Sequence, residues 1–137
     1  MEKSCGLIIF RKEKTLEFLL LKSHSEWCFP KGHVEPNESE LQTALRETME
    51  ETSLANLTIL PSFRELLTYQ YRREGKTVSK KCIYFLAIFN EGSIKISDEH
   101  LDYGWFSLDE ALVKLHHQNA KNLLIAANSF IVKTHSN

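Results

Sequence analysis

Three glutamates with helical spacing stand near the middle of the chain, in the run Arg46-Glu47-Thr-Met-Glu50-Glu51. At about 100° per residue, Glu50 and Glu51 lie roughly 60° and 40° to either side of Glu47, so the three carboxylates share one helix face. Like charges at this spacing repel one another, and a bound cation reverses that cost. Hard carboxylate oxygens suit Mg²⁺ or Mn²⁺. Taken alone, a glutamate-rich helix face is more often simply solvated.

These carboxylates are predicted to lie on a helix that begins at Ser39. Ser39 and Gln42, three residues later, form a capping box, which marks a helix N-terminus. The spacing of one apolar stripe is followed by Leu41, Ala44, Leu45, Thr48 and Met49. The preceding residues 31–38 contain Gly, Pro and Asn, which predicts a loop that leads into this helix.

The remaining elements are predicted to be strands in hairpins, with two more helices near the C-terminus. Strands are expected over residues 6–10, 16–21, 57–60, 63–72, 78–89, 94–96 and 103–106, with a charged turn at 73–76. A second capping box, Ser107 with Glu110, predicts a helix to about Leu115, and residues 120–132 have the pattern of a final amphipathic helix. Hairpins together with helices indicate an α/β fold, in which helices cover the faces of a mixed sheet.

Length and composition predict a single domain over residues 1–137. The chain is 42% hydrophobic and 26% charged, and its formal net charge is -1. It therefore has no overall basic field of the kind found in proteins that bind nucleic acid, so no stable nucleic-acid partner is expected. Cys5, Cys28 and Cys82 have no metal-binding or redox spacing, which favours free thiols in the cytoplasm. No stretch approaches the ~20 apolar residues of a membrane span.

A longer pattern around the glutamates makes the solvated-face interpretation untenable. Every fixed position of G-x5-E-x7-R-E-U-x-E-E is filled by the residues Gly32, Glu38, Arg46, Glu47, Glu50 and Glu51. The chain thereby resembles the Nudix hydrolase family, which implies an α/β/α sandwich whose loop-helix-loop holds divalent cations against a pyrophosphate. Two positions depart from the pattern: Ser53 replaces the terminal glycine, where a left-handed cap favours Gly, and Thr48 replaces an apolar residue.

The resemblance also implies roles for individual residues. Glu47, Glu50, Glu51 and the backbone carbonyl of Gly32 would bind Mg²⁺, with Glu99 as a further candidate ligand and Mn²⁺ as a substitute. Arg46 would hold the carboxylates by charge-assisted hydrogen bonds. Three carboxylates remain candidates for the general base that activates the attacking water: Glu47, Glu51 and Glu99.

Several segments are similar to a narrower group, the asymmetrically cleaving diadenosine tetraphosphate hydrolases: residues 5–11, 17–21, 27–36 and 97–100, followed by Trp105. This implies a nucleotide polyphosphate as substrate. Its phosphate chain would meet Lys31 and the hairpin lysines Lys76, Lys80 or Lys81, and its bases would stack on Tyr69, Trp27 or Tyr84. Core packing is an equally good explanation for Trp27 and Tyr84, and solvation is the more common state of hairpin lysines.

Two positions differ from that group, and two other functions stay open. His117 takes the place of a Tyr or Phe that stacks on a base, and Glu26 takes the place of a His before the tryptophan. The same scaffold also removes pyrophosphate from triphosphorylated RNA ends. A catalytically inactive nucleotide-sensing or protein-binding module would be expected to lose the glutamates, which this chain keeps. A monomer or weak dimer is expected.

Overall fold

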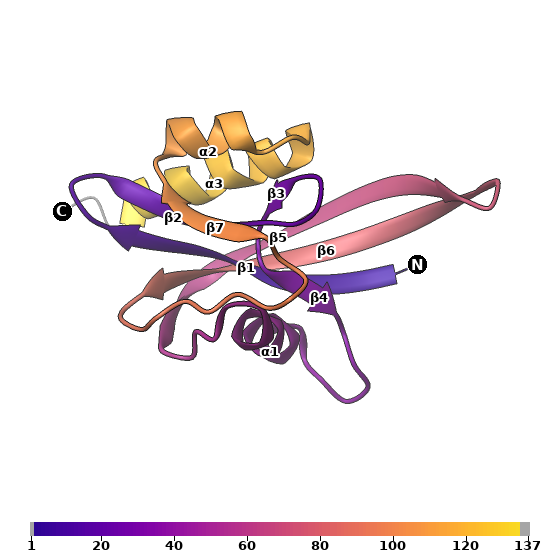
Figure 1. The fold of residues 1–137 in the computed structure, drawn as a ribbon, viewed down its shortest axis with the longest axis horizontal. Helices are drawn as coiled ribbons and strands as arrows, with labels where there is room; N and C mark the ends of the chain where they lie inside the picture. Colours follow the sequence, from indigo (N-terminus) through magenta and orange to yellow (C-terminus); the bar gives the residue numbers. More distant parts are fainter. Residues whose placement is uncertain (1, 135–137) are drawn as a thin grey trace.

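Strand β1 (Glu2–Lys12) lies at the centre of a seven-stranded sheet in the computed structural model, which describes residues 2–134 (Figure 1). On one side β1 pairs antiparallel with β2 (Leu16–Lys22) and β4 (Lys31–His33). On its other side it runs parallel to β6 (Lys76–Phe89) along most of its length. A strand paired on both sides and covered on both faces must be apolar throughout, which explains its continuous hydrophobic run.

Three further strands complete the sheet: β3 (Trp27–Cys28), β5 (Leu57–Arg73) and β7 (Asp102–Phe106). The main order is β3-β2-β1-β6-β5, with β7 paired to β2 and β4 paired to β1. Among the strand pairs of residues 2–134, only the β1–β6 pair is parallel. The predicted mixed sheet is therefore confirmed.

The β5–β6 hairpin is longer than the other strand pairs and contains a bulge. Pro61 has no N–H to donate and Ser62 adopts a positive φ of 74°, so the register shifts between Leu60 and Glu65. The sequence predicts two strands here, whereas one strand continues through the irregularity. The hairpin closes at Glu74 and Gly75, whose φ values of 52° and 76° are those of a type I′ turn.

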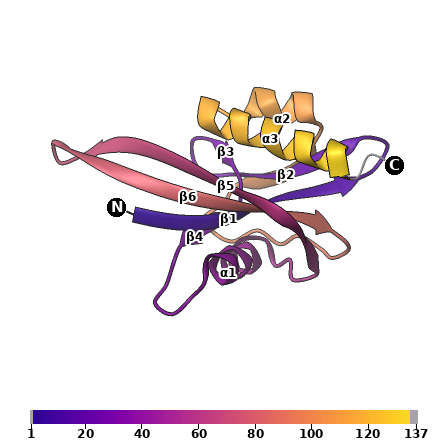
Figure 2. The ribbon, with the colours of Figure 1, turned by 180° about the vertical axis from the view of Figure 1, so that it is seen from behind.

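The outer part of this hairpin extends beyond the rest of the sheet. Strand β1 begins at Glu2, opposite Lys80, so farther out β5 and β6 pair only with each other. Residues 69–80 form this projecting part, hereafter the arm, at the end of the molecule opposite the β1–β2 turn (Figure 2).

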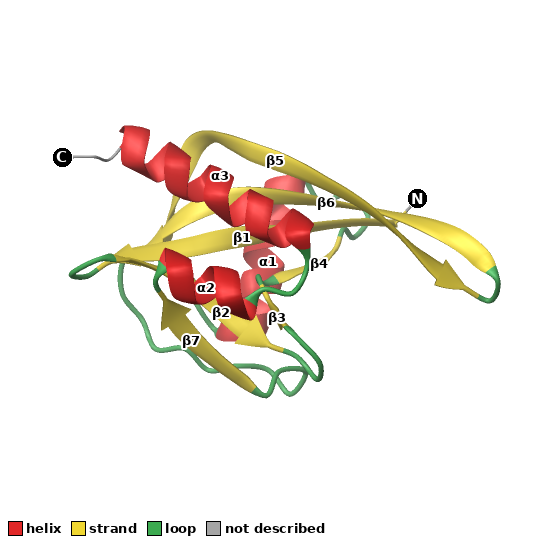
Figure 3. Cartoon of the chain, turned by 90° about the horizontal axis from the view of Figure 1, so that it is seen from above, coloured by secondary structure: helices red, strands yellow, loops and turns green. Residues whose placement is uncertain are grey.

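Helices cover both faces of the sheet, as Figure 3 shows. One face carries α1 (Glu40–Thr52), and the other carries α2 (Leu108–Lys114) and α3 (Gln118–Thr134). The predicted capping boxes at Ser39 and Ser107 are both present. The architecture is the α/β/α sandwich expected from the resemblance. No helix within residues 2–134 combines the length and the apolar character that crossing a membrane requires.

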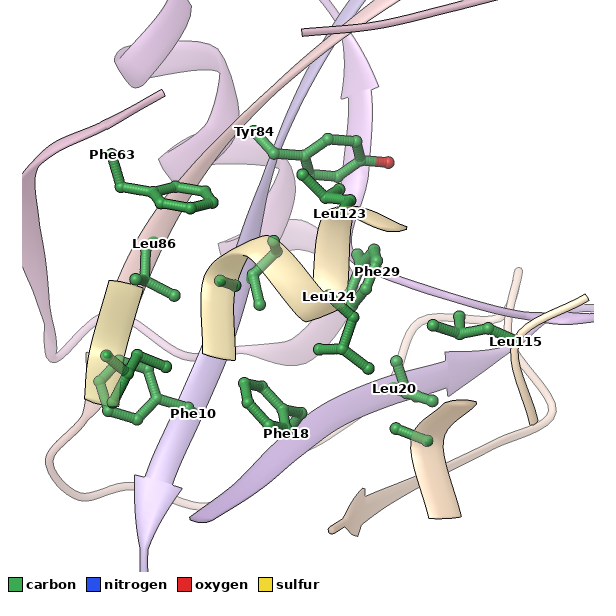
Figure 4. Close-up of a cluster of buried hydrophobic side chains, with 14 of the residues drawn as sticks. Phe10, Phe18, Leu20, Phe29, Phe63, Tyr84, Leu86, Leu115, Leu123 and Leu124 are labelled. Atoms are coloured by element: carbon green, nitrogen blue, oxygen red, sulfur yellow. The ribbon is translucent and has the colours of Figure 1, made fainter. Parts of the chain in front are cut away.

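The sheet divides the hydrophobic core into two layers. Between the sheet and α2 and α3 lie Phe10, Phe18, Leu20, Leu86 and Leu124, among others (Figure 4). Between the sheet and α1 lie Cys5, Leu7, Ile9, Leu19 and Ile83. Alternation along β1 sends successive side chains into opposite layers, which holds its backbone fixed from both sides.

Helix α1 is rotated relative to its predicted apolar stripe. Leu45 and Met49 are 36% and 44% exposed, whereas Thr48 and Thr52 are buried beside Ala44. These small residues let the helix approach the sheet closely and turn its glutamates toward β4. Two other predictions were wrong: residues 94–96 are not a strand, and part of the predicted loop, residues 31–33, is strand β4.

Candidate active site

Arg46 is the centre of an acidic cluster made of Glu38, Glu47, Glu50 and Glu51. Its guanidinium donates from Nε to Glu38 Oε2 at 2.6 Å and from a terminal nitrogen to Glu47 Oε2 at 2.9 Å. It also donates to Glu50 Oε1 at 3.1 Å and to the carbonyl of His33 at 3.0 Å. The Arg46 hydrogen bond lowers the pKa of Glu38 to about 2, so this carboxylate stays charged and clamps the arginine.

Glu51 is the buried member of the cluster, with its side chain 12% exposed. Burial, followed by the neighbouring Glu47 carboxyl, raises its pKa to about 8, partly offset by the backbone N–H of Lys31. A Cβ at Gly32 would overlap the Glu47 carboxyl group, so only glycine leaves room for that side chain. Two carboxylates forced together at low exposure attract a cation.

The segment from Lys95 to His100 is fixed against the C-terminal end of α1. Lys95 and Ser97 donate backbone hydrogen bonds to the carbonyls of Thr52 and Glu51 at 2.9 and 3.1 Å. This brings His100 Nε2 to 3.9 Å from Glu51 Oε1. Burial is the main cause of the lowered pKa of His100, which favours a neutral ring.

Glu99 is exposed on that segment, close enough for its charge to oppose the lowering of the His100 pKa. Within residues 2–134, no hydrogen bond or ion pair joins Glu99 to Glu47 or Glu51. Sequence reasoning selected Glu99 and missed His100 as a neighbour of Glu51. The signal was the motif at 97–100, in which both residues occur.

A pair of lysines lies beside this cluster. The pKa of Lys80 is lowered first by burial and then by the charge of Lys31, and Lys31 also partly offsets the rise in the pKa of Glu51. Neither lysine is in an ion pair with a carboxylate within residues 2–134. Ser4 lies two residues along β1 from Glu2, the residue opposite Lys80. The hydroxyl of Ser4 is buried and has no hydrogen-bond partner among the described residues. Unpaired cations side by side are suited to bind an anion.

Tyr69 is the aromatic residue nearest to this lysine pair in the sheet register, directly across from Lys80. It is half-buried, and its hydroxyl is 3.3 Å from Cys82 Sγ. Burial and that contact raise its pKa, so the phenol stays neutral. The structure thus brings together Lys31, Lys80 and Tyr69, three of the predicted substrate-binding residues.

The other predicted aromatic contacts are part of the packing. Tyr84 is 4% exposed and packs edge-on against Phe29 at 5.7 Å between ring centroids, inside the core shown in Figure 4. Trp27 packs against Phe106 at 5.2 Å, and the Lys114 ammonium lies 5.0 Å from its ring centroid. Core packing therefore explains Tyr84 fully, and Trp27 keeps only a half-exposed ring.

The two remaining hairpin lysines lie away from Lys31. Lys76 is at the tip of the arm, four residues farther out than Lys80. Lys81 points to the opposite face of the sheet from Lys80, because side chains alternate along a strand. Its partner in β1 is Lys3, which lies on the α1 face and forms an ion pair with Glu40 of α1 at 2.8 Å. The sequence alone could not show that Lys76 and Lys81 lie away from Lys31, because this depends on the register of the hairpin.

The two departures from the diadenosine tetraphosphate hydrolase pattern meet each other in space. His117 Nε2 lies 2.8 Å from Glu26 Oε2, which joins the turn before α3 to the loop before β3. Both side chains are solvent-accessible, at 68% and 38% exposure. The charge of Glu26 also contributes to the raised pKa of Tyr69.

The donor set of the acidic cluster fits a hard divalent cation. Three carboxylates and the carbonyl of Gly32 are oxygen donors, and the glycine is needed to admit Glu47. As the side chains stand, no group of three carboxylate, His or Cys side chains in the described part of the chain is arranged to hold a metal. Arg46 donates hydrogen bonds to both Glu47 and Glu50 in this arrangement, so these carboxylates would have to change partner to bind a cation.

Comparisons with known proteins show the family of this chain. The family model of the NUDIX domain matches residues 2–126. The mouse bis(5′-nucleosyl)-tetraphosphatase (asymmetrical) is 40% identical over 96% of this chain and 97% of its own length. The pig protein of the same name is 41% identical over 94% and 95%. A crystal structure of a C. elegans Ap4A hydrolase binary complex, 35% identical, covers 97% of this chain and 99% of its own with a TM-score of 0.88.

Nudix hydrolases generally need a divalent metal, and the acidic cluster on α1 contains carboxylate oxygens of the kind that such an ion prefers. The match extends over the sheet, over α1 and over the first part of α3. The chain therefore belongs to the Nudix family and is a pyrophosphohydrolase similar to the asymmetrical diadenosine tetraphosphate hydrolases.

Proposed function

We propose that this protein hydrolyses diadenosine tetraphosphate asymmetrically, into ATP and AMP. The observation that carries the proposal is the buried Glu51 carboxyl of the acidic cluster next to Lys31, which in turn affects the charge of Lys80. Hydrolysis of a pyrophosphate bond is helped by both kinds of group. A cation would bind the phosphoryl oxygens at one point, and the ammonium groups would neutralise the negative charge of the remaining phosphates. The similarity to the mouse and pig enzymes supports the same substrate.

Four donors would hold Mg²⁺ in this proposal: the carboxylates of Glu47, Glu50 and Glu51 and the carbonyl of Gly32. Mn²⁺ would serve in its place, since it prefers the same oxygen ligands. When bound, the ion polarises a phosphoryl oxygen and acidifies a water. Arg46 keeps the carboxylates close together before binding, since it already bonds to Glu47 and Glu50.

A carboxylate accepts the proton of the attacking water. Glu51 is favoured by its burial, whereas Glu99 is the exposed alternative on the facing segment, and Glu47 is the third candidate. With its pKa at about 8, Glu51 is protonated in the metal-free protein near neutral pH and becomes a base only when a cation is near. His100 beside Glu51 stays neutral and adds no competing positive charge.

Lys31 and Lys80 bind the phosphate chain in this proposal, and Tyr69 stacks on one adenine. Stacking contributes about 1–3 kcal/mol per base in other nucleotide sites, enough to hold one end of a flexible substrate in register. A substrate held in this register would place its fourth phosphorus at the acidic cluster, where a carboxylate would accept the proton of the attacking water. ATP then forms on the anchored side, and AMP leaves from the other.

Product analysis tests the proposal directly. Diadenosine tetraphosphate, nucleoside triphosphates and triphosphorylated RNA are incubated separately with the protein and Mg²⁺, and the products are separated by ion-exchange chromatography. Equal amounts of ATP and AMP are expected from the dinucleotide. In water enriched in ¹⁸O the label is expected in AMP. Two ADP molecules would contradict the register, and label in ATP would move the attack to the other phosphorus.

A further inference from the structure

The arm is held in place by a contact with the start of β1. The hydroxyl of Tyr71 donates to Glu2 Oε2 at 2.6 Å, and Arg73 donates to the same hydroxyl at 2.8 Å. The Arg73 guanidinium also lies 5.3 Å from the Tyr71 ring centroid and 3.3 Å from the Glu2 carboxylate. An isolated two-stranded hairpin is marginally stable in water, and these contacts order the side chains of this one.

The two faces of the arm differ in chemistry. Side chains alternate along each strand, so cross-strand partners share a face. The face turned in the same direction as α2 and α3 carries Tyr69, Tyr71, Arg73, Lys76, Val78 and Lys80. The opposite face carries Gln70, Arg72, Thr77 and Ser79. Only the first face alternates aromatic rings with cations.

This aromatic and basic face is continuous with the lysine pair of the active site. Lys80 belongs to both, since it neighbours Lys31 and lies across from Tyr69. From Lys80 to Lys76 the strand covers about 13 Å at ~3.3 Å per residue, long enough for the cations of this face to meet successive phosphates of one strand. Glu2 offsets part of the charge of Arg73, and Lys76 has no ion-pair partner among residues 2–134.

We propose that this face of the arm binds a single-stranded polynucleotide whose 5′ phosphates lie at Lys31 and Lys80. Single strands are bound by rings that stack on bases and by cations that follow the backbone, which is what Tyr69, Arg73 and Lys76 provide. A net charge of -1 for the whole chain predicts no such partner, but the arm concentrates basic residues locally. The proposal uses the proposed function only to locate the 5′ phosphates.

Neighbouring residues of equal charge supply the test and its control. Arg73→Gln removes a cation from the aromatic face, and Arg72→Gln removes one from the opposite face. The probe is a 3′-fluorescein single-stranded RNA of about twelve nucleotides, within the ~4–16-nucleotide sites of other single-strand binders. Binding is measured by fluorescence anisotropy in EDTA, with a 5′-hydroxyl and a 5′-triphosphate form of the probe. Because no cleavage is involved, the result is independent of whether diadenosine tetraphosphate is a substrate.

The wild-type protein is expected to bind the 5′-hydroxyl probe with a Kd of about 10⁻⁴–10⁻⁶ M. The slope of log K against log salt should be about -2, at ~0.7 per phosphate for contacts to Lys80, Arg73 and Lys76. Arg73→Gln should reduce the slope by ~0.7 and weaken binding about fivefold at ~0.1 M salt, whereas Arg72→Gln should bind as the wild type does. The 5′-triphosphate should tighten binding.

Three results would overturn the proposal. Equal losses of RNA affinity in Arg72→Gln and Arg73→Gln would mean that binding depends on total charge and not on the aromatic face of the arm. If the protein does not bind the RNA probe at low salt, a polynucleotide is excluded as the ligand of the arm. Association of the chain into dimers that the Arg73 variant disrupts, without RNA binding, would assign the arm to a second copy of the protein.

Discussion

Replacement of Glu51 by glutamine should stabilise the metal-free protein at high pH while it abolishes catalysis. In the folded protein the pKa of Glu51 is raised from 4.5 to about 8, mainly by burial and then by Glu47. Between these two values the folded protein binds the proton more tightly than the unfolded chain does. Stability is therefore fully present below pH ~4.5 and decreases as the pH rises toward 8. Glutamine is neutral at every pH and has the shape of the protonated acid.

The size of the effect follows from the same shift. At ~1.36 kcal/mol per pKa unit, complete ionisation of Glu51 lowers the free energy of unfolding by at most about 5 kcal/mol above pH 8. About half of this loss is expected, because Glu51 shares the repulsion with Glu47. A domain of this size changes its Tm by about 4 °C per kcal/mol. Glu51→Gln should therefore melt about 8 °C or more above the wild type at pH 8.5 in EDTA, and at the same temperature at pH 5.

Thermal denaturation followed by circular dichroism, in EDTA and across pH 5–8.5, measures this difference. Glu50→Gln is the matched control, because its side chain is 56% exposed on the same helix and should show no such pH-dependent gain. A wild-type Tm that stays constant over this range would refute the reasoning. With Mg²⁺, Glu51→Gln should lose most of its turnover. If Glu51→Gln keeps more than about a tenth of wild-type kcat, the carboxylate contributes less than ~1.4 kcal/mol of transition-state stabilisation, which contradicts its role as a metal ligand.

Three further substitutions give separate results. Lys31→Ala should slow cleavage or raise KM without changing the Mg²⁺ affinity measured by calorimetry, since the ammonium meets phosphate and not metal; a shift in the metal titration would disprove this role. Gly32→Ala should lower kcat by at least about tenfold, because a Cβ there displaces the Glu47 carboxyl group. Ser53→Gly should raise the free energy of unfolding in urea by about 0.5–1 kcal/mol, since Ser53 has a φ of 67°; loss of its 3.3 Å bond to the Lys95 carbonyl opposes this gain.

The chemistry of the site was visible in the sequence because its parts are local. Helix α1 begins at Ser39 as its capping box predicts, and Arg46 contacts the neighbouring glutamates through one helical turn. Helical spacing alone fixes such contacts. Ser53 adopts the left-handed cap conformation, for which the glycine of the family pattern is suited.

Other features depend on contacts between distant segments, which local patterns do not encode. Strand β4 exists because residues 31–33 pair with the start of β1, and the rotation of α1 follows from how closely its threonines approach the sheet. The separation of Lys80 from Lys76 and Lys81 follows from register and strand alternation. The contact between Glu26 and His117 joins positions 91 residues apart.

The parallel pairing of β1 with β6 has a consequence for synthesis on the ribosome. Residues 4–10 of β1 are buried in the finished protein, yet their partners in β6 lie nearly 80 residues later in the chain. At ~5–20 residues per second, this apolar strand waits about 4–16 s before β6 has been translated. An unpaired strand of this composition is prone to aggregate, so the nascent chain should be a client of ribosome-associated chaperones during that interval.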